Sequence, residues 1–172
     1  VGEWLEQWAR DTPHALAFAE PDGQGGWRRL SWAALRVEVG GVAQALLDLK
    51  LPPGKPIAIL SDNALDHLVL VLAGMHIGRA VCTISSGYCR LATDDYSRIH
   101  GILQTLDPCL VYASNADIYG PPLVWSGISA VEVFSVGAET RAGAVSFAKL
   151  AATAETPAVM QAPVQSGMPA TP

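Results

Sequence analysis

Two hydrophobic patterns alternate along this chain: short apolar runs, and longer segments with helical spacing. The apolar runs are PIAIL, AVCTI, CLVYA and AVEVF, at residues 56–60, 80–84, 109–113 and 130–134. Runs without polar alternation are typical of parallel strands buried on both faces, and helices between such strands form right-handed crossovers. The pattern predicts an α/β fold with a mostly parallel, layered sheet of β-α-β units and helices on both of its faces.

The N-terminal segment carries a different pattern. Residues 3–10 place large apolar side chains on one helical face, which predicts a short helix that ends before Pro13. Residues 15–20 and 26–30 flank the glycine-rich string PDGQGG and predict an N-terminal antiparallel β-hairpin. The string also resembles part of a dinucleotide-binding fingerprint, but a fingerprint opens a helix, whereas a strand follows here. We therefore interpret it as the hairpin turn.

The helices between the strands show start and stop signals. Ser31 is placed to cap a helix over residues 32–49, in which leucine and valine recur at spacings of three and four. A second helix starts at SDN, residues 61–63, whose side chains offer caps, and ends at Gly78, a suitable left-handed terminator. A short helix is also predicted over residues 146–152.

A further helix is predicted to open at Thr93, with Asp94 and Asp95 in its first turn, and to stop at Asp107 and Pro108. The two adjacent acids have two interpretations. They could serve acid–base or metal chemistry, or they could complement the positive end of the helix dipole. We favour the second interpretation because it needs no further chemistry.

Composition narrows the classes of protein. At 172 residues the chain is long enough for one domain with a core of ordinary size, and 50% of its residues are hydrophobic. A formal net charge of -5 offers no basic field, which argues against nucleic-acid binding. The longest strongly apolar stretch, residues 65–75, is too short to cross a bilayer. We expect a protein that binds neither nucleic acid nor membrane.

Cysteine and histidine spacing gives no sign of a metal site. Cys82, Cys89 and Cys109 are odd in number and form no Cys-x-x-Cys pair, which indicates free, mostly buried thiols rather than disulfides or a zinc site. His67 and His76 share a predicted helix, but their nine-residue separation points them to different sides. Since no signal peptide precedes the first helix, we expect a cytoplasmic protein.

One segment is a weak candidate for cofactor binding. Ser85, Ser86, Gly87 and Tyr88 follow the second predicted strand, and ligands bind at the carboxyl ends of parallel strands. Backbone amides there could hold an anion. No helix is predicted to start directly after them, so a structural connection is the plainer interpretation. The chain shows no nucleophile elbow, zinc motif or phosphate-loop motif, and we assign neither catalytic residues nor a metal site.

The order of the motifs resembles a known family. LEQWARDTPHALAF, WRRLSWAAL and KPIAILSDNALDHLVLVLAGMHIGRAVCTIS are similar to the opening part of the AMP-forming acyl-CoA synthetases, the adenylate-forming family. The next stretch is most similar to feruloyl-CoA synthetases, which share the pattern Ser-x-x-Tyr-x-x-Leu-x-x-Asp, here Ser85, Tyr88, Leu91 and Asp94. The resemblance covers residues 4–113 well and residues 147–151 weakly.

Membership in that family implies a reaction. An aromatic carboxylic acid is activated by ATP and magnesium to an acyl-adenylate, and the thiol of coenzyme A then takes the acyl group. The family's phosphate, adenine, ribose and magnesium motifs lie downstream of the stretch that matches. The resemblance therefore implies a partial N-terminal domain, an acid–thiol ligase as the parent, and the remainder of that enzyme as the partner.

The string VQSGMPATP, residues 164–172, is compared with the family's phosphate loop. Ser166, Gly167, Met168 and Pro169 match that loop only if three of its residues are removed, and Ala170 stands where the loop has lysine. Loss of the amides and of the cation would leave phosphate charge uncompensated. We expect no catalytic residue in this chain, no cofactor held by it alone, and no activity in isolation.

The sequence predicts two regions: a folded N-terminal subdomain over residues 1–152, and a flexible tail rich in proline and alanine over residues 153–172. Two other interpretations stay open. The chain could be a stand-alone doubly wound module that binds a small anion or a nucleotide. It could also be a non-catalytic structural piece that associates with itself or with a partner through an exposed sheet edge.

Overall fold

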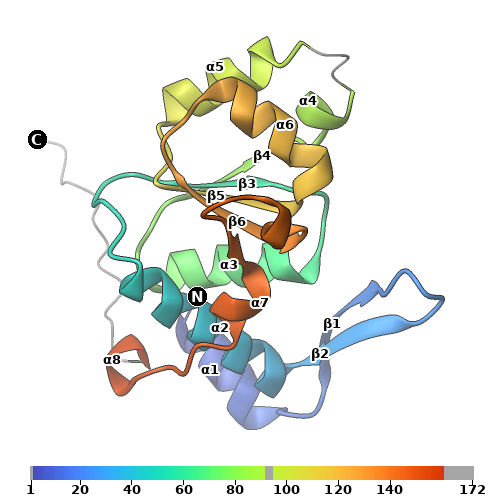
Figure 1. The fold of residues 1–172 in the computed structure, drawn as a ribbon. Helices are drawn as coiled ribbons and strands as arrows, with labels where there is room; N and C mark the ends of the chain where they lie inside the picture. Colours follow the sequence, from blue (N-terminus) through green and yellow to red (C-terminus); the bar gives the residue numbers. More distant parts are fainter. Residues whose placement is uncertain (1, 92–94, 161–172) are drawn as a thin grey trace, which may run out of the picture.

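The computed structural model describes residues 2–91 and 95–160, and it confirms the predicted α/β fold (Figure 1). The N-terminal part comprises α1 (Gly2–Asp11), β1 (Leu16–Pro21), β2 (Trp27–Ser31) and α2 (Trp32–Asp48). The central part comprises β3 (Ile57–Leu60), α3 (Leu65–His76), β4 (Val81–Ile84), α4 (Gly87–Arg90), α5 (Ser97–Leu106), β5 (Leu110–Asn115), α6 (Ala116–Ser126) and β6 (Val131–Val136). The last part comprises the 3-10 helix η1 (Ala138–Thr140), β7 (Val145–Ser146), α7 (Phe147–Ala151) and α8 (Pro157–Met160).

The central sheet is parallel throughout, as the uninterrupted apolar runs predict. Its strand order is β4-β3-β5-β6-β7, and the antiparallel pair β1-β2 forms a separate sheet. Ile57 of β3 lies level with Val81 of β4 and with Leu110 of β5, so the three strands start in register. Among the described strands, β4 and the short β7 therefore form the two edges.

Helices cover both faces of this sheet, and alternate strand residues point into two cores. Ile57 and Ile59 pack with the layer that contains α1, α2, α3 and α7. Ala58 and Leu60 pack with the layer that contains α4, α5 and α6. All four side chains are fully buried, which explains why the strand shows no polar alternation. The two layers lie on opposite sides of the sheet in Figure 1.

The hairpin forms around the predicted glycine-rich turn. Asp22 closes the turn because its carboxylate accepts hydrogen bonds from the backbone amides of Gln24 and Gly26, both at 2.8 Å. Trp32, the first residue of α2, packs against Trp4 and Trp8 of α1 and against Phe18 of β1. These aromatic contacts join the hairpin to the helices around it.

The start of α3 corrects the predicted capping by residues 61–63. The helix begins at Leu65, its N-cap position is Ala64, and no side chain of its own caps it. The Ser61 hydroxyl instead bonds to His67 Nδ1 (2.9 Å). Glu20 of the hairpin accepts the Leu65 backbone N–H at 2.7 Å, so the helix end is satisfied by a tertiary contact that local sequence cannot encode. The predicted terminator Gly78 is confirmed by its left-handed φ of 70°.

The start of α5 also differs from the prediction. The helix begins at Ser97 rather than at Thr93, which with Asp94 lies outside the described residues. Asp95 precedes the helix, and its carboxylate accepts the Ser97 backbone N–H at 2.9 Å. This hydrogen bond lowers the pKa of Asp95 below its ordinary value. The predicted stop is confirmed, because Asp107 ends the helix in the left-handed conformation.

The predicted tail begins at Thr153, and its first part contains α8. The remaining tail residues, including Ser166, Gly167, Met168 and Pro169, lie outside the described residues, so the boundary and the flexibility of the tail stay predictions. The three cysteines are free, with Cys89 and Cys109 buried and Cys82 half-buried, as expected. No helix in the described part of the chain is both long and apolar enough to span a bilayer.

Candidate functional site at the carboxyl edge of the sheet

Polar side chains gather near the carboxyl ends of β3, β4 and β6. This edge is where open parallel sheets bind ligands, so it is the first place to look for function. Two groups of residues lie there, one on each side of the end of β3. The Asp62 cluster consists of Ser61, Asp62, His67, Ser86 and Arg90. The Arg28 cluster consists of Glu20, Arg28, Glu38, Asp66, Tyr112 and Ser135.

The Asp62 cluster contains one of the four residues that the sequence singled out. The Ser86 hydroxyl donates to Asp62 Oδ1 at 2.5 Å, and the Arg90 guanidinium pairs with Asp62 Oδ2. Both members of the ion pair are exposed, with side-chain fractions of 51% for Arg90 and 56% for Asp62. An exposed pair of this kind contributes little stability.

The other three predicted residues surround Ser86. Ser85 is exposed after β4, and Gly87 begins the one-turn helix α4, where the sequence predicted a connection without a helix. The Tyr88 ring lies under the guanidinium of Arg98, 5.5 Å from its centroid. In the structure, Ser86 thus contacts the Asp62 carboxylate, and the Tyr88 ring contacts the Arg98 guanidinium. Whether these residues contact a cofactor stays a prediction.

The chemistry of this edge can be compared with what ATP requires. A triphosphate is bound by cations and backbone amides, and Arg90 is already paired with Asp62. Within residues 2–91 and 95–160, no group of three or more His, Cys, Asp or Glu residues could hold a metal ion. We derive no catalytic step from the described residues.

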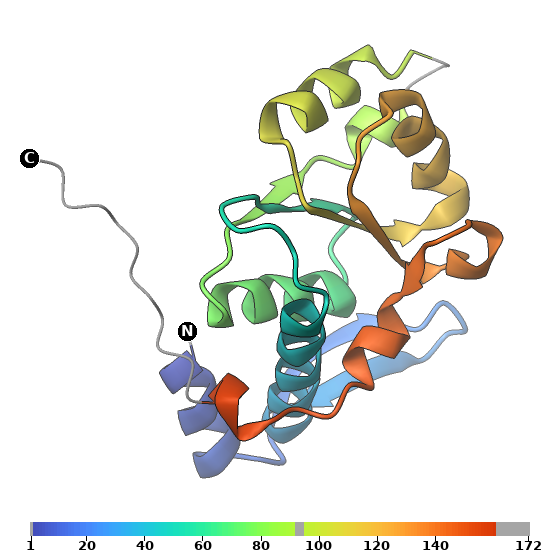
Figure 2. The same ribbon diagram turned by 60° about the vertical axis from the view of Figure 1, so that its left-hand side comes forward.

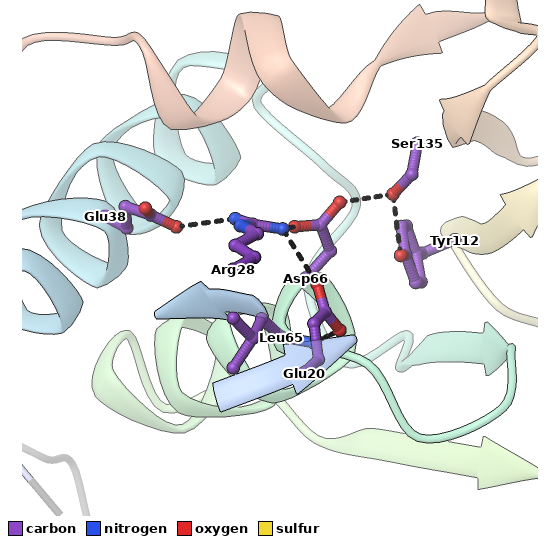
Figure 3. Close-up of polar contacts among 7 residues, drawn as sticks. All are labelled: Glu20, Arg28, Glu38, Leu65, Asp66, Tyr112 and Ser135. Carbon is purple, nitrogen blue, oxygen red and sulfur yellow. Dashed lines mark hydrogen bonds and ion pairs between the residues drawn. The ribbon is translucent and has the colours of Figure 1, made fainter. Parts of the chain in front are cut away.

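The Arg28 cluster connects the hairpin to the rest of the domain (Figure 3). Arg28 of β2 donates through Nη1 to Glu20 Oε1 (3.3 Å) and Asp66 Oδ1 (2.5 Å), and through Nη2 to Glu38 Oε2 (3.2 Å). Glu20 lies directly across from Arg28 in the hairpin, whereas Glu38 belongs to α2 and Asp66 to α3. One guanidinium thus joins three separate elements.

The cluster extends onto the sheet through Asp66. Its second oxygen, Oδ2, accepts a hydrogen bond from the Ser135 hydroxyl of β6 at 2.5 Å. The Tyr112 hydroxyl of β5 lies 2.8 Å from Ser135 Oγ, and Tyr112 is fully buried. Figure 3 shows the chain of contacts running from Glu38 through Arg28 and Asp66 to Tyr112. The cluster is a polar joint between the hairpin, α2, α3 and the sheet.

Burial and charge shift the titration of this joint. Burial raises the pKa of Glu38, and the neighbouring Asp66 and Glu20 carboxylates add to that rise, while Arg28 opposes it. Burial alone would lower the pKa of Arg28, but its hydrogen bond to Asp66 and the nearby carboxylates raise it. Burial likewise raises the pKa of the Tyr112 hydroxyl. Three carboxylates around one guanidinium leave an excess of negative charge, so Arg28 is the residue on which the others depend.

An open groove of about 380 Å³ lies beside both clusters, between β1 and α3. Its walls include Phe18, Leu68 and Val71, and polar side chains border it, among them Glu20 and His67. Glu20 already bonds to Arg28 and to the backbone of α3, and His67 Nδ1 bonds to Ser61. The groove is therefore mainly an apolar surface, without a set of polar groups converging on a ligand.

Sequence reasoning found only part of this edge. It identified Ser85, Ser86, Gly87 and Tyr88 from their place after a strand. It missed the role of Arg28. One signal was available, because Glu20 and Arg28 form an opposite-charge pair across the predicted hairpin.

The fold is an open α/β domain in which helices cover both faces of a parallel sheet. The family of AMP-binding enzymes matches residues 5–161 of the sequence. The chain therefore belongs to the AMP-binding enzyme family.

Solved structures of enzymes share this fold. The luciferase-like enzyme of the mealworm Zophobas morio is 14% identical with a TM-score of 0.70, and the match covers 90% of this chain and 34% of that one. An acyl-CoA synthetase of Brucella canis is 16% identical with a TM-score of 0.69, covering 84% and 26% of the two chains. The acetoacetyl-CoA synthetase of Streptomyces lividans is 17% identical with a TM-score of 0.75, covering 90% and 25%.

These comparisons confirm the predicted architecture, that of the N-terminal domain of adenylate-forming enzymes. The chain spans about a third or less of the length of these structures. Among proteins of curated function, none matches the sequence significantly.

Proposed function

We propose that this chain is the N-terminal part of an acid–CoA ligase similar to the feruloyl-CoA synthetases. The complete enzyme would activate an aromatic carboxylic acid with ATP and magnesium to an acyl-adenylate and transfer the acyl group to coenzyme A. The observation that carries the proposal is the match to the AMP-binding family over residues 5–161. The acyl-CoA synthetase of Brucella canis and the acetoacetyl-CoA synthetase of Streptomyces lividans, which share the fold, support the reaction class.

In this proposal the chain supplies a scaffold. The parallel sheet forms one wall of the larger domain, and the Arg28 cluster fixes the hairpin against that wall. The groups that bind ATP, magnesium and coenzyme A come from the remainder of the enzyme, its main partner. Ser85, Ser86, Gly87 and Tyr88 border the substrate cleft. The enzyme acts in the cytoplasm and binds neither nucleic acid nor membrane.

The test is an adenylation assay with hydroxylamine as the trap. The protein encoded by the complete reading frame around residues 1–172 is incubated with ATP, magnesium and one acid at a time: ferulate, 4-coumarate, benzoate, octanoate or acetate. We expect ATP-dependent hydroxamate to form fastest with ferulate or 4-coumarate. A preference for octanoate or acetate would refute the aromatic substrate. No hydroxamate from any acid would refute the ligase itself.

The same assay on residues 1–172 alone tests the scaffold role. We expect no hydroxamate above the reaction without ATP. Turnover by the isolated chain would contradict the view that its residues supply no catalytic group.

A further inference from the structure

The segment that follows α7 runs along α2 and ends at α8, near α1 (Figures 1 and 2). We call residues 153–160 the strap. It carries few large apolar residues, yet the side chain of Val159 is only 1% exposed and belongs to the core beneath the sheet. The Val159 carbonyl also accepts a hydrogen bond from His76 Nε2 of α3 at 2.8 Å. The strap is therefore held by residues far from it in sequence.

A pair of glycines in the middle of α2 makes room for this segment. A Cβ atom at Gly41 would lie 2.7 Å from the Ala151 carbonyl oxygen and 2.8 Å from that of Thr153. A Cβ atom at Gly40 would meet the Glu155 carboxylate, the end of a flexible side chain that can move aside. Glycine weakens a helix interior, so Gly41 is explained by the close approach of the backbone at Ala151 and Thr153.

Polar contacts on both sides of the glycine pair in α2 hold the strap. Gln44 is 8% exposed, and its Oε1 accepts both the backbone N–H (3.1 Å) and the hydroxyl (2.8 Å) of Thr156. Arg36, one helical turn before Gly40, pairs with Glu155 through Nη1 and with Glu6 of α1 through Nε (2.8 Å). The contacts repeat along one face of α2 at positions 36, 40 and 44, spaced as one helical row.

We propose that the strap is a positioning element, in which residues 153–160 are fixed on α2 and so set the path of the backbone up to residue 160. This proposal rests on the proposed ligase function, because its consequence is that the strap sets where the following chain enters the larger domain. Gly41, Gln44 and Thr156 are then positioning residues for adenylate formation, acting through the path of the backbone rather than by contact with substrate. Release of the strap lowers the rate of the chemical step without unfolding the sheet.

Amide hydrogen exchange tests, independently of activity, whether the strap is packed on α2. Gly41→Ala places a methyl group against two backbone carbonyls, and Gly101→Ala is the matched control, since its Cβ in the interior of α5 meets nothing within 4 Å. In residues 1–172, we expect Gly41→Ala to speed amide exchange over residues 153–160 by about tenfold, and Gly101→Ala to leave it unchanged. Unprotected amides in the wild-type strap, or equal exchange in both variants, would overturn the proposal.

A second pair of variants covers the case in which Gly41→Ala fails to fold. Thr156→Val removes the hydroxyl that donates a hydrogen bond to Gln44, whereas Thr156→Ser keeps it. We expect Thr156→Val to speed exchange of the strap by about threefold or more and Thr156→Ser to restore wild-type exchange. Equal exchange in both would overturn the role of this hydrogen bond.

Activity of the complete enzyme tests the coupling. We expect Gly41→Ala and Thr156→Val to lower kcat for hydroxamate formation by about tenfold, with KM for the acid unchanged. We expect the melting temperature of Thr156→Val to stay near that of Thr156→Ser, so that a loss of kcat in this variant is not a loss of fold. Faster exchange with an unchanged kcat would overturn the coupling. If the wild-type enzyme forms no adenylate with any acid, the ligase proposal fails, and the exchange experiment still decides whether the strap is seated.

Discussion

Replacing Arg28 with methionine tests whether the hairpin is fixed by one guanidinium. The substitution keeps an apolar side chain of similar reach, but it leaves three carboxylates close together without a cation. Breaking a buried ion pair costs about 3–5 kcal/mol, whereas an exposed pair is worth about 0–1 kcal/mol. The Arg28 side chain is 38% exposed and that of Asp66 is 15% exposed, so this site lies between the two limits.

We therefore expect Arg28→Met to lower the free energy of unfolding by about 2 kcal/mol. In a chain of this size that loss lowers the melting temperature by roughly 4–8 °C. Urea titration followed by tryptophan fluorescence measures it as a lower midpoint with an unchanged slope. Arg29→Met is the matched control, because the neighbouring Arg29 is exposed on the hairpin, and we expect it to change stability by less than about 0.5 kcal/mol.

The pH dependence of this loss follows from Glu38. Burial and the other carboxylates raise the folded-state pKa of Glu38, so its ionised form costs stability at neutral pH, and the cost disappears as pH falls below the unfolded pKa. Removal of Arg28 increases that cost, since Arg28 opposes the rise in pKa. The difference between wild type and Arg28→Met should therefore shrink as pH is lowered from 7 towards the carboxylate range. A loss that matches Arg29→Met, or that stays constant with pH, would refute the reasoning.

Three further predictions test the packing, the thiols and the sheet edge. Gly74→Ala should lower the free energy of unfolding by about 1–3 kcal/mol in urea titration, because its Cβ would lie 2.5 Å from Val81 Cγ2, where α3 packs on β4. An unchanged free energy of unfolding would mean that α3 can move away from β4 at this point. Burial raises the pKa of the Cys89 thiol to about 11. Mass spectrometry after brief alkylation at pH 8 should therefore find the half-buried Cys82 modified well before Cys89, and the reverse order would contradict the described burial. Sedimentation equilibrium should show concentration-dependent association through the edge strand β4 that Thr83→Lys weakens, whereas a strictly monomeric wild type would count against it.

The parallel sheet could be predicted because its signal is local. A strand such as β3 is buried on both faces, so each of its residues must be apolar, and four such runs with helical segments between them leave few other architectures. The hairpin was equally readable from its glycine-rich turn. Short elements such as α4, β7 and α8 were not, because two to four residues carry no period.

The start of α3 shows why local signals fail at the functional edge. Residues 61–63 have the composition of a helix cap, but Ser61 bonds to His67, and the helix is capped by Glu20, 45 residues earlier in the chain. Arg28 and Asp66 are similarly 38 residues apart. Such contacts depend on how the hairpin packs against α2 and α3, and local sequence patterns carry no signal for that packing. Only the cross-strand pair of Glu20 and Arg28 had a local signature.

The charges at the carboxyl edge indicate which part of the proposed enzyme would supply the cations that bind ATP. The cations of the two clusters are already paired with carboxylates of this chain, Arg28 with Asp66 and Arg90 with Asp62. A phosphate at this edge would have to compete with those carboxylates for the two guanidinium groups. Under the proposed function, we therefore expect the cations for ATP to come from the remainder of the enzyme. Substitutions in the Arg28 cluster should accordingly reduce adenylation only in proportion to the loss of folded or correctly positioned domain. A variant such as Arg28→Met that retained full stability but lost all adenylation would mean that this segment supplies chemistry after all.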